Sequence, residues 1–353
     1  MLSIVIAFLL VPYAIIICAS CLCVRRQWHT KSPFWGANKQ GVSVVVCVHK
    51  ESLSTVVSCL NSIKKALSET DEIVVVADRA SEDVCHYLAE NYLYAQTSNG
   101  LFGKKNAQRK GVDLARNELI LCTDADCQML PDCINAVRKV AMSKDDEVVL
   151  LPIRMYGTPD TFGRLVEMEF ACLQMTGLGT AMLGLPTMVN GAGMAFSKSL
   201  YLRHNSKADT YASGDDMFLL EHAIKSKSTI SVCACSDAVI QTSAPTTLHG
   251  YLRQRIRWFG KAGGYSTVAV KLLAVAVFSA NVSWTLALLI GSWTLGTALF
   301  LCKSIVDGYA CFSGKRTLQT HAILSDILLL EMLYPLMILI VVCGAVVSDK
   351  KKW

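Results

Sequence analysis

The sequence lacks the motifs of several common functional classes. Its 15 cysteines include no set of C-x-x-C pairs at the spacing of a zinc site, and their odd number cannot all pair in internal disulfides. The phosphate-binding pattern G-x-x-x-x-G-K-[ST] is also absent. Despite a formal net charge of +6, the middle of the chain has no basic helix interleaved with aromatic residues, so we expect no nucleic-acid partner. We interpret the cysteines as reduced thiols that mostly act as small hydrophobic side chains.

Charge is scarce at the two ends of the chain. Hydrophobic residues make up 52% of the 353 residues and the mean hydropathy is +0.39, which is too apolar for an ordinary soluble protein. Leu2–Val24 is uncharged and is followed by Arg25 and Arg26. A cleaved signal peptide would need a basic start and a small-x-small cleavage site, which this segment lacks. We therefore expect a retained membrane anchor over residues 1–25, with the arginine pair on the cytoplasmic side, and a linker over residues 26–41.

The C-terminal region, residues 266–353, is also strongly apolar. Thr267–Cys302 is too long for one span and long enough for two short ones, and Ile323–Val347 is a further candidate span. The latter segment carries Asp326 and Glu331, and acids at such depth usually face a bundle interior or mark a pathway. We expect two or three C-terminal spans, with three favoured by length, whereas the side of the C-terminus stays open.

The middle of the chain alternates between strand-like and helix-like segments. In chain order these segments are Val42–Val48 (strand), Leu53–Leu67 (helix), Asp71–Ala77 (strand), Glu82–Asn91 (helix) and the apolar run Leu119–Cys122 (strand). This alternation predicts an α/β domain with a mostly parallel sheet that is covered by helices. In such sheets, ligands bind beyond the carboxyl ends of the strands.

Acidic residues stand where these strands end. Glu51 and Asp78 follow the first two strands, and Asp124 and Asp126 follow the third. Because the carboxyl ends of parallel strands meet at one edge of a sheet, we expect these side chains to line a single crevice. Two carboxylates in an Asp-x-Asp turn can converge on Mg²⁺ or Mn²⁺ and leave positions open for phosphate oxygens. Taken alone, such a triplet is more often a surface turn, so its meaning depends on its neighbours.

A basic segment lies between the second strand and the acidic pair. Asn99–Gly111 contains Gly103 followed by Lys104 at the expected start of a helix, a position that suits a bound anion. For the run of charges alone, a solvated basic helix face is the favoured interpretation.

Taken together, Val42–Trp258 resembles the catalytic domain of family-two, inverting, membrane-bound glycosyltransferases. This broad group contains cellulose, chitin and hyaluronan synthases and ceramide glucosyltransferase-like enzymes. The resemblance implies a glycosyltransferase A-type fold, a Rossmann-like and mostly parallel sheet, flanked by transmembrane helices. The matching pieces, in the order expected for the family, are the first strand with Glu51, Asp78, Gly103-Lys104, Thr123-Asp124-Ala125-Asp126, Ser213-Gly214-Asp215-Asp216 and Gln254-Arg255-Ile256-Arg257-Trp258.

The resemblance implies a role for each acidic residue. Asp78 would bind the base of a uridine-type nucleotide, with the Glu51 region lining the same pocket. Asp124 would support the nucleotide, and Asp126 would hold a metal ion, Mg²⁺ or Mn²⁺, that bridges the diphosphate. Asp216 would be the general base that deprotonates the acceptor hydroxyl.

The resemblance also implies substrate-binding roles for basic and aromatic residues. Lys104 belongs to the donor-binding segment. Gln254, Arg257 and Trp258 lie in an expected helix over residues 246–265 and would contact the diphosphate and the acceptor end.

This helix has a plainer interpretation as a structural element. Leu252, Ile256 and Phe259 would form a buried stripe at helical spacing, and the flanking arginines would place the helix at the membrane interface. That alternative explains the residues one by one. It does not explain their coincidence with the acidic motifs upstream, so the functional interpretation is favoured.

The sequence departs from the family pattern at two places. The motif that holds the base commonly reads Glu-Asp in the family, whereas here it reads Gly214-Asp215-Asp216. Asp215 is therefore a rival for the role of catalytic base. The first motif commonly reads Asp-Asp-Gly-Ser, whereas here Asp78 is followed by Arg79, which could alter contacts to the base or the phosphates.

These observations lead to one functional prediction and two alternatives. We expect a catalytic domain over residues 42–245 with metal-dependent hexosyltransferase activity, which moves a sugar from a nucleotide diphosphate, UDP by preference, to a hydroxyl of a lipid or glycan acceptor. We expect a multi-pass protein of the cell (inner) membrane with this domain in the cytoplasm. The alternatives are a catalytically silent scaffold that binds sugar nucleotides, and a glycosidase that uses Asp215 or Asp216 with another acid.

Overall fold

The computed structural model describes residues 8–29, 40–97, 103–141, 146–204, 215–261, 264–321 and 323–347. Most of the expected linker, residues 98–102 of the basic segment, Ser213-Gly214 and the C-terminal lysines lie outside the described residues.

The chain divides into two compact units. The sheet unit comprises residues 29–153, 189–243 and 349–353, and the helical unit comprises residues 1–28, 154–188 and 244–348. Two short strands, β6 (Ile153–Tyr156) and β9 (Ile240–Ser243), mark the places where the chain leaves the sheet unit and enters the helical unit.

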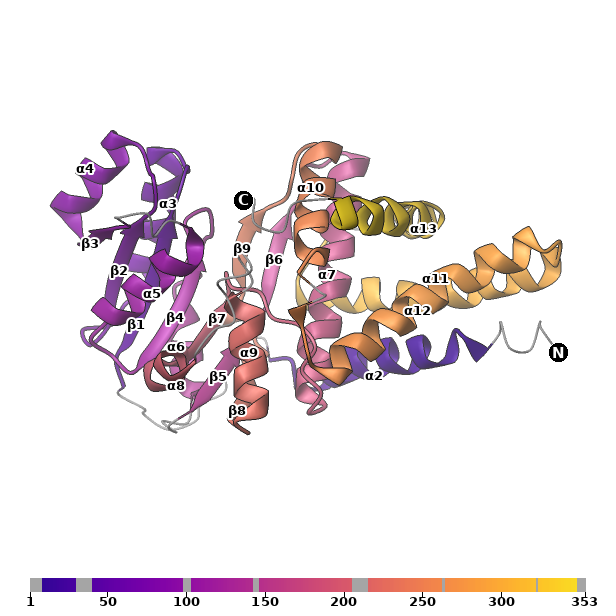
Figure 1. The fold of residues 1–353 in the computed structure, drawn as a ribbon, viewed down its shortest axis with the longest axis horizontal. Coiled ribbons are helices and arrows are strands. Elements are labelled where there is room, and N and C mark those ends of the chain that lie inside the picture. The colour runs from indigo at the N-terminus through magenta and orange to yellow at the C-terminus, as the bar shows by residue number, and fades with distance from the viewer. Residues whose placement is uncertain are drawn as a thin grey trace. The chain divides into compact units, whose positions relative to one another are not determined.

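The sheet unit is built on a seven-stranded sheet (Figure 1). β1 pairs in parallel with β2 and β4, β2 with β3, and β5 with β8, whereas β7 runs antiparallel to its neighbours β4 and β5. The predicted mostly parallel sheet is therefore confirmed. The strands in spatial order are β3 (Leu93–Gln96), β2 (Glu72–Ala77), β1 (Val42–Val48), β4 (Leu119–Asp124), β7 (Met194–Ser197), β5 (Glu147–Leu150) and β8 (Thr229–Val232).

The run of valines in β1 forms the centre of the sheet. Val44, Val45 and Val46 are all fully buried, although successive side chains of a strand point to opposite faces. Val45 is in register with Val74 on one side and with Cys122 on the other. Both faces of the sheet are thus covered, which explains why the run is continuously apolar and does not alternate.

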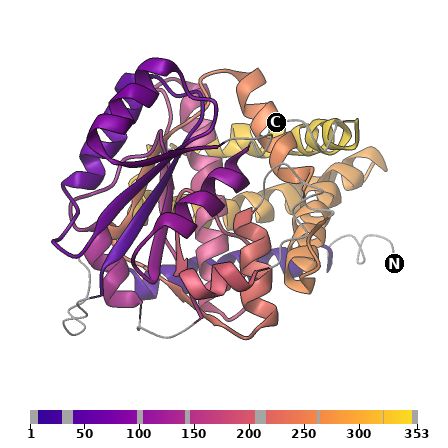
Figure 2. The ribbon, with the colours of Figure 1, turned by 60° about the vertical axis from the view of Figure 1, so that its left-hand side comes forward.

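Helices flank the sheet, as Figure 2 shows. Within the described residues they are α3 (Leu53–Lys64), α4 (Glu82–Asn91), α5 (Lys104–Leu114), α6 (Cys133–Val140), α8 (Lys198–Arg203) and α9 (Asp215–Lys225), with the short 3-10 helix η2 (Ser236–Ala238). α5 packs closely on β1, because a Cβ added at Gly111 would come within 2.5 Å of Cγ1 of Val45. The predicted helix over Leu53–Leu67 ends earlier than expected, at Lys64.

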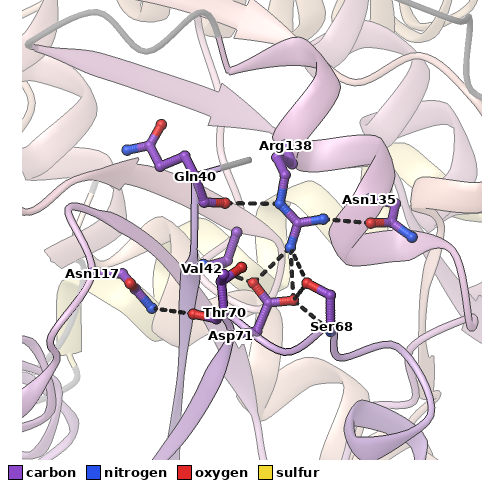
Figure 3. Close-up of polar contacts among 8 residues, drawn as sticks. All are labelled: Gln40, Val42, Ser68, Thr70, Asp71, Asn117, Asn135 and Arg138. Carbon is purple, nitrogen blue, oxygen red and sulfur yellow. Dashed lines mark hydrogen bonds and ion pairs between the residues drawn. The ribbon is translucent and has the colours of Figure 1, made fainter. Parts of the chain in front are cut away.

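A buried ion pair fixes the start of β1 (Figure 3). Nη2 of Arg138 lies 2.6 Å from Oδ1 of Asp71, and both side chains are buried. The guanidinium also donates to the carbonyl of Gln40 at 2.8 Å and to the hydroxyl of Ser68 at 2.9 Å. The Asp71 carboxylate accepts a further hydrogen bond from the backbone N–H of Val42 at 2.8 Å. These contacts join α6 to the ends of β1 and β2 that lie away from their carboxyl termini.

We expect the Asp71→Asn substitution to destabilise the sheet unit. Burial acts to raise the pKa of Asp71, but hydrogen bonds from Arg138 and Ser68 outweigh it and hold the pKa below its usual value. The substitution leaves the Arg138 charge buried without its partner, which costs about 3 kcal/mol of unfolding free energy. The measurement is unfolding of the detergent-purified protein at neutral pH, with Asp113→Asn as control because Asp113 forms an exposed pair with Arg109.

The same pair makes stability depend on pH. The folded-state pKa of Asp71 lies below that of the unfolded chain, so its contribution is fully present above about pH 4 and is lost as the pH falls through the folded value. Acid unfolding of the wild type should show this loss, and Asp71→Asn should flatten it. Equal acid sensitivity of both proteins would contradict the assignment.

The helical unit contains three helices that are long and apolar enough to cross a membrane: α11 (Val268–Leu289), α12 (Trp293–Thr317) and α13 (Leu324–Val347). They correspond to the three C-terminal spans that length favours. α2 (Val11–Gln27) is not among them, and residues 1–7 lie outside the described part of the chain. The unit also contains α7 (Thr161–Met182) and α10 (Leu248–Phe259).

Charged side chains inside this unit are paired. On α12, Lys303 lies 2.7 Å from Asp307, one turn away, and 2.6 Å from Glu331 of α13. The hydroxyl of Tyr13 on α2 also donates to Asp307. Lys303 and Glu331 are buried. Glu331 therefore faces the interior of the helix bundle, which is one of the two expectations for an acid at this depth.

Candidate functional site

The site is built where β1, β2 and β4 end. Because these strands are parallel and adjacent, their carboxyl ends lie at one edge of the sheet. Glu51 follows β1, Asp78 follows β2, and β4 ends at Asp124. The structure thus places the predicted strand-end acids at the same edge.

Lys104 and Asp124 form an ion pair at this edge of the sheet. The ammonium of Lys104 donates to Oδ1 of Asp124. Lys104 is the first residue of α5, and Gly103 before it has a φ of 104°, which a residue with a side chain rarely adopts. Burial acts to lower the pKa of Lys104, but the charges of Asp124 and then of Asp216 outweigh it and raise the pKa. Lys104 therefore stays protonated and neutralises part of the acidic cluster.

Asp126 lies at the tip of the turn after β4. The turn is closed by a hydrogen bond from the N–H of Cys127 to the carbonyl of Asp124 at 3.1 Å, and the Asp126 side chain is exposed. Partial desolvation and then the charges of Asp124 and Glu51 raise the pKa of Asp126. The like charges of Asp124 and Glu51 add to the effect of desolvation, and a bound cation would offset their repulsion.

Asp78 is held by three side chains. Its carboxylate lies 3.2 Å from Nδ1 of His49 and 3.6 Å from Nη2 of Arg79, and it accepts a hydrogen bond from the hydroxyl of Thr97 at 2.8 Å. The Asp78 side chain is 4% exposed. Arg79 has a φ of 56°, an uncommon conformation for a residue other than glycine. His49 and Thr97 were missed by the sequence analysis, and the position of His49 directly after β1 is the signal that could have indicated it.

Glu51 belongs to the same electrostatic cluster. Its carboxylate accepts the backbone N–H of His49 at 2.6 Å. Burial, followed by the charges of Asp126, Asp124 and Glu51, raises the pKa of the Cys59 thiol to about 12. Cys59 therefore lies close enough to all three carboxylates for their charges to act on its thiol.

Asp216 is oriented by backbone N–H groups. Its Oδ2 accepts from Gly191 at 2.9 Å, and its Oδ1 accepts from Met217 at 2.9 Å. The two bonds fix the plane of the carboxylate at the start of α9. Asp215 is the first residue of α9, and its side chain lies outside the described part of the structure. Sequence analysis did not predict Gly191 as a partner, because its neighbour Asp216 is 25 residues away along the chain.

We expect that a side chain at position 191 lowers the catalytic activity. A Cβ there would lie 3.3 Å from Oδ2 of Asp216, tighter than an ordinary contact, so Gly191→Ala should displace the carboxylate by a few tenths of an ångström. If Asp216 acts on the acceptor, kcat should fall about tenfold with an unchanged KM for the donor. Gly308→Ala is the control, since a Cβ at that glycine would meet nothing within 4 Å. A Gly191→Ala variant with wild-type kcat would show that the position of Asp216 is not critical.

The remaining predicted substrate-binding residues lie on α10 in the helical unit and are Gln254, Arg257 and Trp258. Gln254 accepts a hydrogen bond from Nη1 of Arg255 at 2.7 Å, and the Trp258 ring centroid lies 4.4 Å from the same guanidinium. Arg257 is exposed. The buried arginine of this motif is Arg255, which donates to Glu169 of α7 through Nε at 3.1 Å.

The buried stripe of the structural alternative for α10 forms only in part, because Leu252 and Ile256 are half-buried. The buried residues of this helix are Tyr251 and Arg255, whereas Phe259 is 43% exposed. The reason is the ion pair with Glu169, which turns the Arg255 face of the helix inward.

The acidic cluster is chemically suited to a divalent cation. No group of three His, Cys, Asp or Glu side chains is arranged as a complete metal site within the described residues. Two carboxylate residues, Asp124 and Asp126, nevertheless offer the oxygen ligands that Mg²⁺ and Mn²⁺ prefer, and such ions usually take their remaining ligands from water and substrate phosphates. The charges of Asp124 and Glu51 contribute, after desolvation, to the raised pKa of Asp126. The residues therefore fit a cation that arrives with a diphosphate.

The fold is that of a glycosyltransferase A-type domain followed by candidate membrane helices. The chain is similar in structure to the mannosyltransferase PcManGT from Pyrobaculum calidifontis, solved in complex with GDP-Man and Mn²⁺, with a TM-score of 0.56, 15% identity and 98% of each chain covered. It also matches S. aureus TarS with a TM-score of 0.44 and 15% identity, over 68% of this chain and 43% of that chain. At these identities the likeness to PcManGT concerns the fold alone.

A family model matches the middle of the chain. Residues 43–203 match the model described as glycosyl transferase family 2, and no curated protein matches the chain. The matched segment includes Glu51, Asp78, Lys104 and the Asp124–Asp126 turn, but it ends before Asp216. The resemblance inferred from the motifs thus agrees with the family model over this segment.

Proposed function

We propose that the protein is a membrane-bound, inverting glycosyltransferase that moves a sugar from a nucleotide diphosphate to an acceptor hydroxyl. The observation that carries this proposal is the gathering of Asp78, Lys104, Asp124 and Asp126 at the carboxyl edge of the sheet, with the charge of Asp216 acting on Lys104. The family match over residues 43–203 and the A-type fold support it.

Donor binding is assigned to the edge between β1 and β2. Asp78 is fixed by His49 and Thr97, so its carboxylate is already oriented to accept hydrogen bonds from a nucleotide base. Uracil is the proposed base. PcManGT was solved with a guanine nucleotide, so GDP-linked sugars are the first alternative.

The leaving diphosphate is assigned to the edge formed by β4 and α5. When a sugar–oxygen bond breaks, negative charge develops on the diphosphate and must be stabilised. Lys104 supplies a fixed positive charge there, and Asp124 and Asp126 would hold Mg²⁺ or Mn²⁺, which stabilises the same charge as a Lewis acid. Asp124 thereby positions Lys104 as well as contributing a ligand oxygen.

Asp216 is the proposed general base. The acceptor O–H loses its proton to the Asp216 carboxylate while its oxygen forms a bond to the anomeric carbon. The bond from that carbon to the diphosphate oxygen breaks on the opposite face, and the nucleoside diphosphate departs with the electron pair. A single displacement of this kind inverts the anomeric configuration and needs no nucleophilic Ser or Cys. Gly191 and Met217 position the base.

The acceptor is proposed to be a lipid or a glycan at the membrane surface, with the catalytic domain in the cytoplasm. Three apolar helices support membrane association, and Arg257 and Trp258 on the exposed and half-buried faces of α10 are proposed to contact the acceptor end. A glycolipid-forming or few-sugar transferase is preferred over a polymer-extruding synthase, because extruding synthases are usually longer and have more spans.

Nucleoside diphosphate release is the test of this function. Purified protein in lipid is supplied with Mn²⁺ or Mg²⁺ and a panel of UDP- and GDP-linked sugars. We expect metal-dependent release with one donor, lost in Asp126→Ala and kept in Asp132→Ala, an exposed acid at the start of α6. A scaffold would bind nucleotide without release, and a glycosidase would act without nucleotide or metal. Either result would contradict the proposal.

A further inference from the structure

An apolar groove of about 830 Å³ lies between α12 and α13 in the helical unit. Its volume is in the range of about 300–1,000 Å³ that is typical of sites for small molecules. Gly308 lies on its wall, and a Cβ there would meet nothing within 4 Å, so the groove is open at this point. The apolar lining includes Leu301, Ile305, Phe312, Ile323, Leu324 and Leu328.

One end of the groove is basic. Phe312 lines the groove, and its ring centroid lies 4.7 Å from the guanidinium carbon of Arg316 and 5.8 Å from that of Arg25, which comes from the end of α2. Lys315 also lines the groove. Among the described residues, neither Arg25 nor Arg316 forms an ion pair with a carboxylate. Two like charges thus meet on one aromatic ring without an acid to balance them.

The two features together define an amphipathic site. The walls belong to helices that are long and apolar enough to cross a membrane, so hydrocarbon chains surround the groove in a bilayer. The cations stand at the C-terminal end of α12, where juxtamembrane Lys and Arg meet lipid headgroups. A ligand that fits both features carries a long apolar chain and a negative charge at one end.

We infer that the α12–α13 groove binds one acyl chain of an anionic glycerophospholipid, whose phosphate is held by Arg25, Lys315 and Arg316. Guanidinium groups are well suited to phosphate oxygens because they donate several hydrogen bonds in one plane. This site is separate from the donor-binding edge of the sheet unit, and its occupancy does not require that the protein transfer a sugar.

Lipid retention measures this binding directly. The full-length protein is transferred from mixed phosphatidylglycerol and phosphatidylcholine into mild detergent, and bound lipids are counted by native mass spectrometry. We expect the wild type to retain phosphatidylglycerol selectively. Arg25→Gln combined with Arg316→Gln should lower phosphatidylglycerol retention about thirtyfold. Each cation near an anionic lipid contributes about fivefold to binding, and the double variant removes two cations.

A matched pair of variants separates the site from general charge attraction. Arg26→Gln combined with Lys271→Gln removes the same net charge from exposed positions without touching Phe312, so retention should stay within about twofold of the wild type. Gly308→Leu fills the groove without changing charge and should also abolish retention, whereas Gly308→Ala should keep most of it. Thermal unfolding of each variant verifies that it is folded.

Three outcomes would overturn the inference. If the wild type retained phosphatidylcholine as well as phosphatidylglycerol, the cations would have no role in selecting the lipid. Equal losses in the two double variants would mean that only overall charge matters. Full retention by a folded Gly308→Leu variant would place the lipid chain outside the groove. None of these results bears on nucleoside diphosphate release, so the inference and the proposed function are tested independently.

Discussion

The Asp216→Asn variant is expected to bind donor normally and to lose nearly all of its sugar transfer. Asn keeps the size of the side chain and one acceptor oxygen for the N–H of Gly191, so the local structure should persist. It cannot take a proton from the acceptor hydroxyl. Positioned general bases contribute about 10²–10⁴-fold, and kcat should fall by that factor.

The measurement pairs acceptor turnover with donor binding by calorimetry. Asp215→Asn is the matched control at the neighbouring position and should retain most of the activity. If Asp216→Asn kept full transfer while Asp215→Asn lost it, the base would be Asp215. Loss of donor binding in Asp216→Asn would instead assign the residue to the donor site.

The Lys104→Met variant is expected to lose most of its activity, because the charge on the leaving diphosphate is less well stabilised. Met has a similar length but no charge, so Asp124 loses its partner and the leaving diphosphate loses a fixed cation. Removing one preorganised group that stabilises developing charge costs about 10²–10³-fold, which should appear in kcat/KM. The KM for the donor should also rise, because the diphosphate is already charged in the ground state.

Lys110→Met is the control for this experiment, since Lys110 lies on the same helix and donates at 2.6 Å to the backbone carbonyl of Gln96. It should leave kcat/KM within about twofold of the wild type. If Lys104→Met behaved in the same way, the basic segment would be a solvated helix face, the interpretation that its charges alone favour.

Much of the fold follows from local patterns in the sequence. The runs Val44–Val46 in β1 and Val74–Val76 in β2 are β-branched and uninterrupted by polar residues, so they predict buried parallel strands without knowledge of their partners. Once these strands are parallel, the positions of Glu51, Asp78 and Asp124 follow, because chain direction decides which strand ends meet. This is why the acidic edge of the site is visible in the sequence.

Other features depend on contacts between distant residues. The reversed direction of β7 is set by its pairing with β4 and β5, and the four residues Met194–Ser197 carry no sign of direction. The buried face of α10 is decided by the pair of Arg255 with Glu169, 86 residues away. Hydrophobic periodicity favours the adjacent face with Leu252 and Ile256, since it counts arginine as exposed. Hydrophobic periodicity mispredicts the buried face of a helix where a charged side chain is buried in an ion pair.

The cluster of Lys303, Asp307 and Glu331 has a consequence for how the protein is made. A lone charged side chain at the centre of a membrane helix costs about 2.5–3.5 kcal/mol on insertion. In the folded unit, Lys303 pairs with Asp307 on α12 itself and also with Glu331 of α13, so α12 offsets the cost that the Glu331 carboxylate brings to α13. α13 is therefore expected to complete its insertion against α12, because synthesis of α13 ends about 30 residues after Thr317, or about 1.5–6 s later at roughly 5–20 residues per second. We therefore expect these two helices to enter the bilayer together.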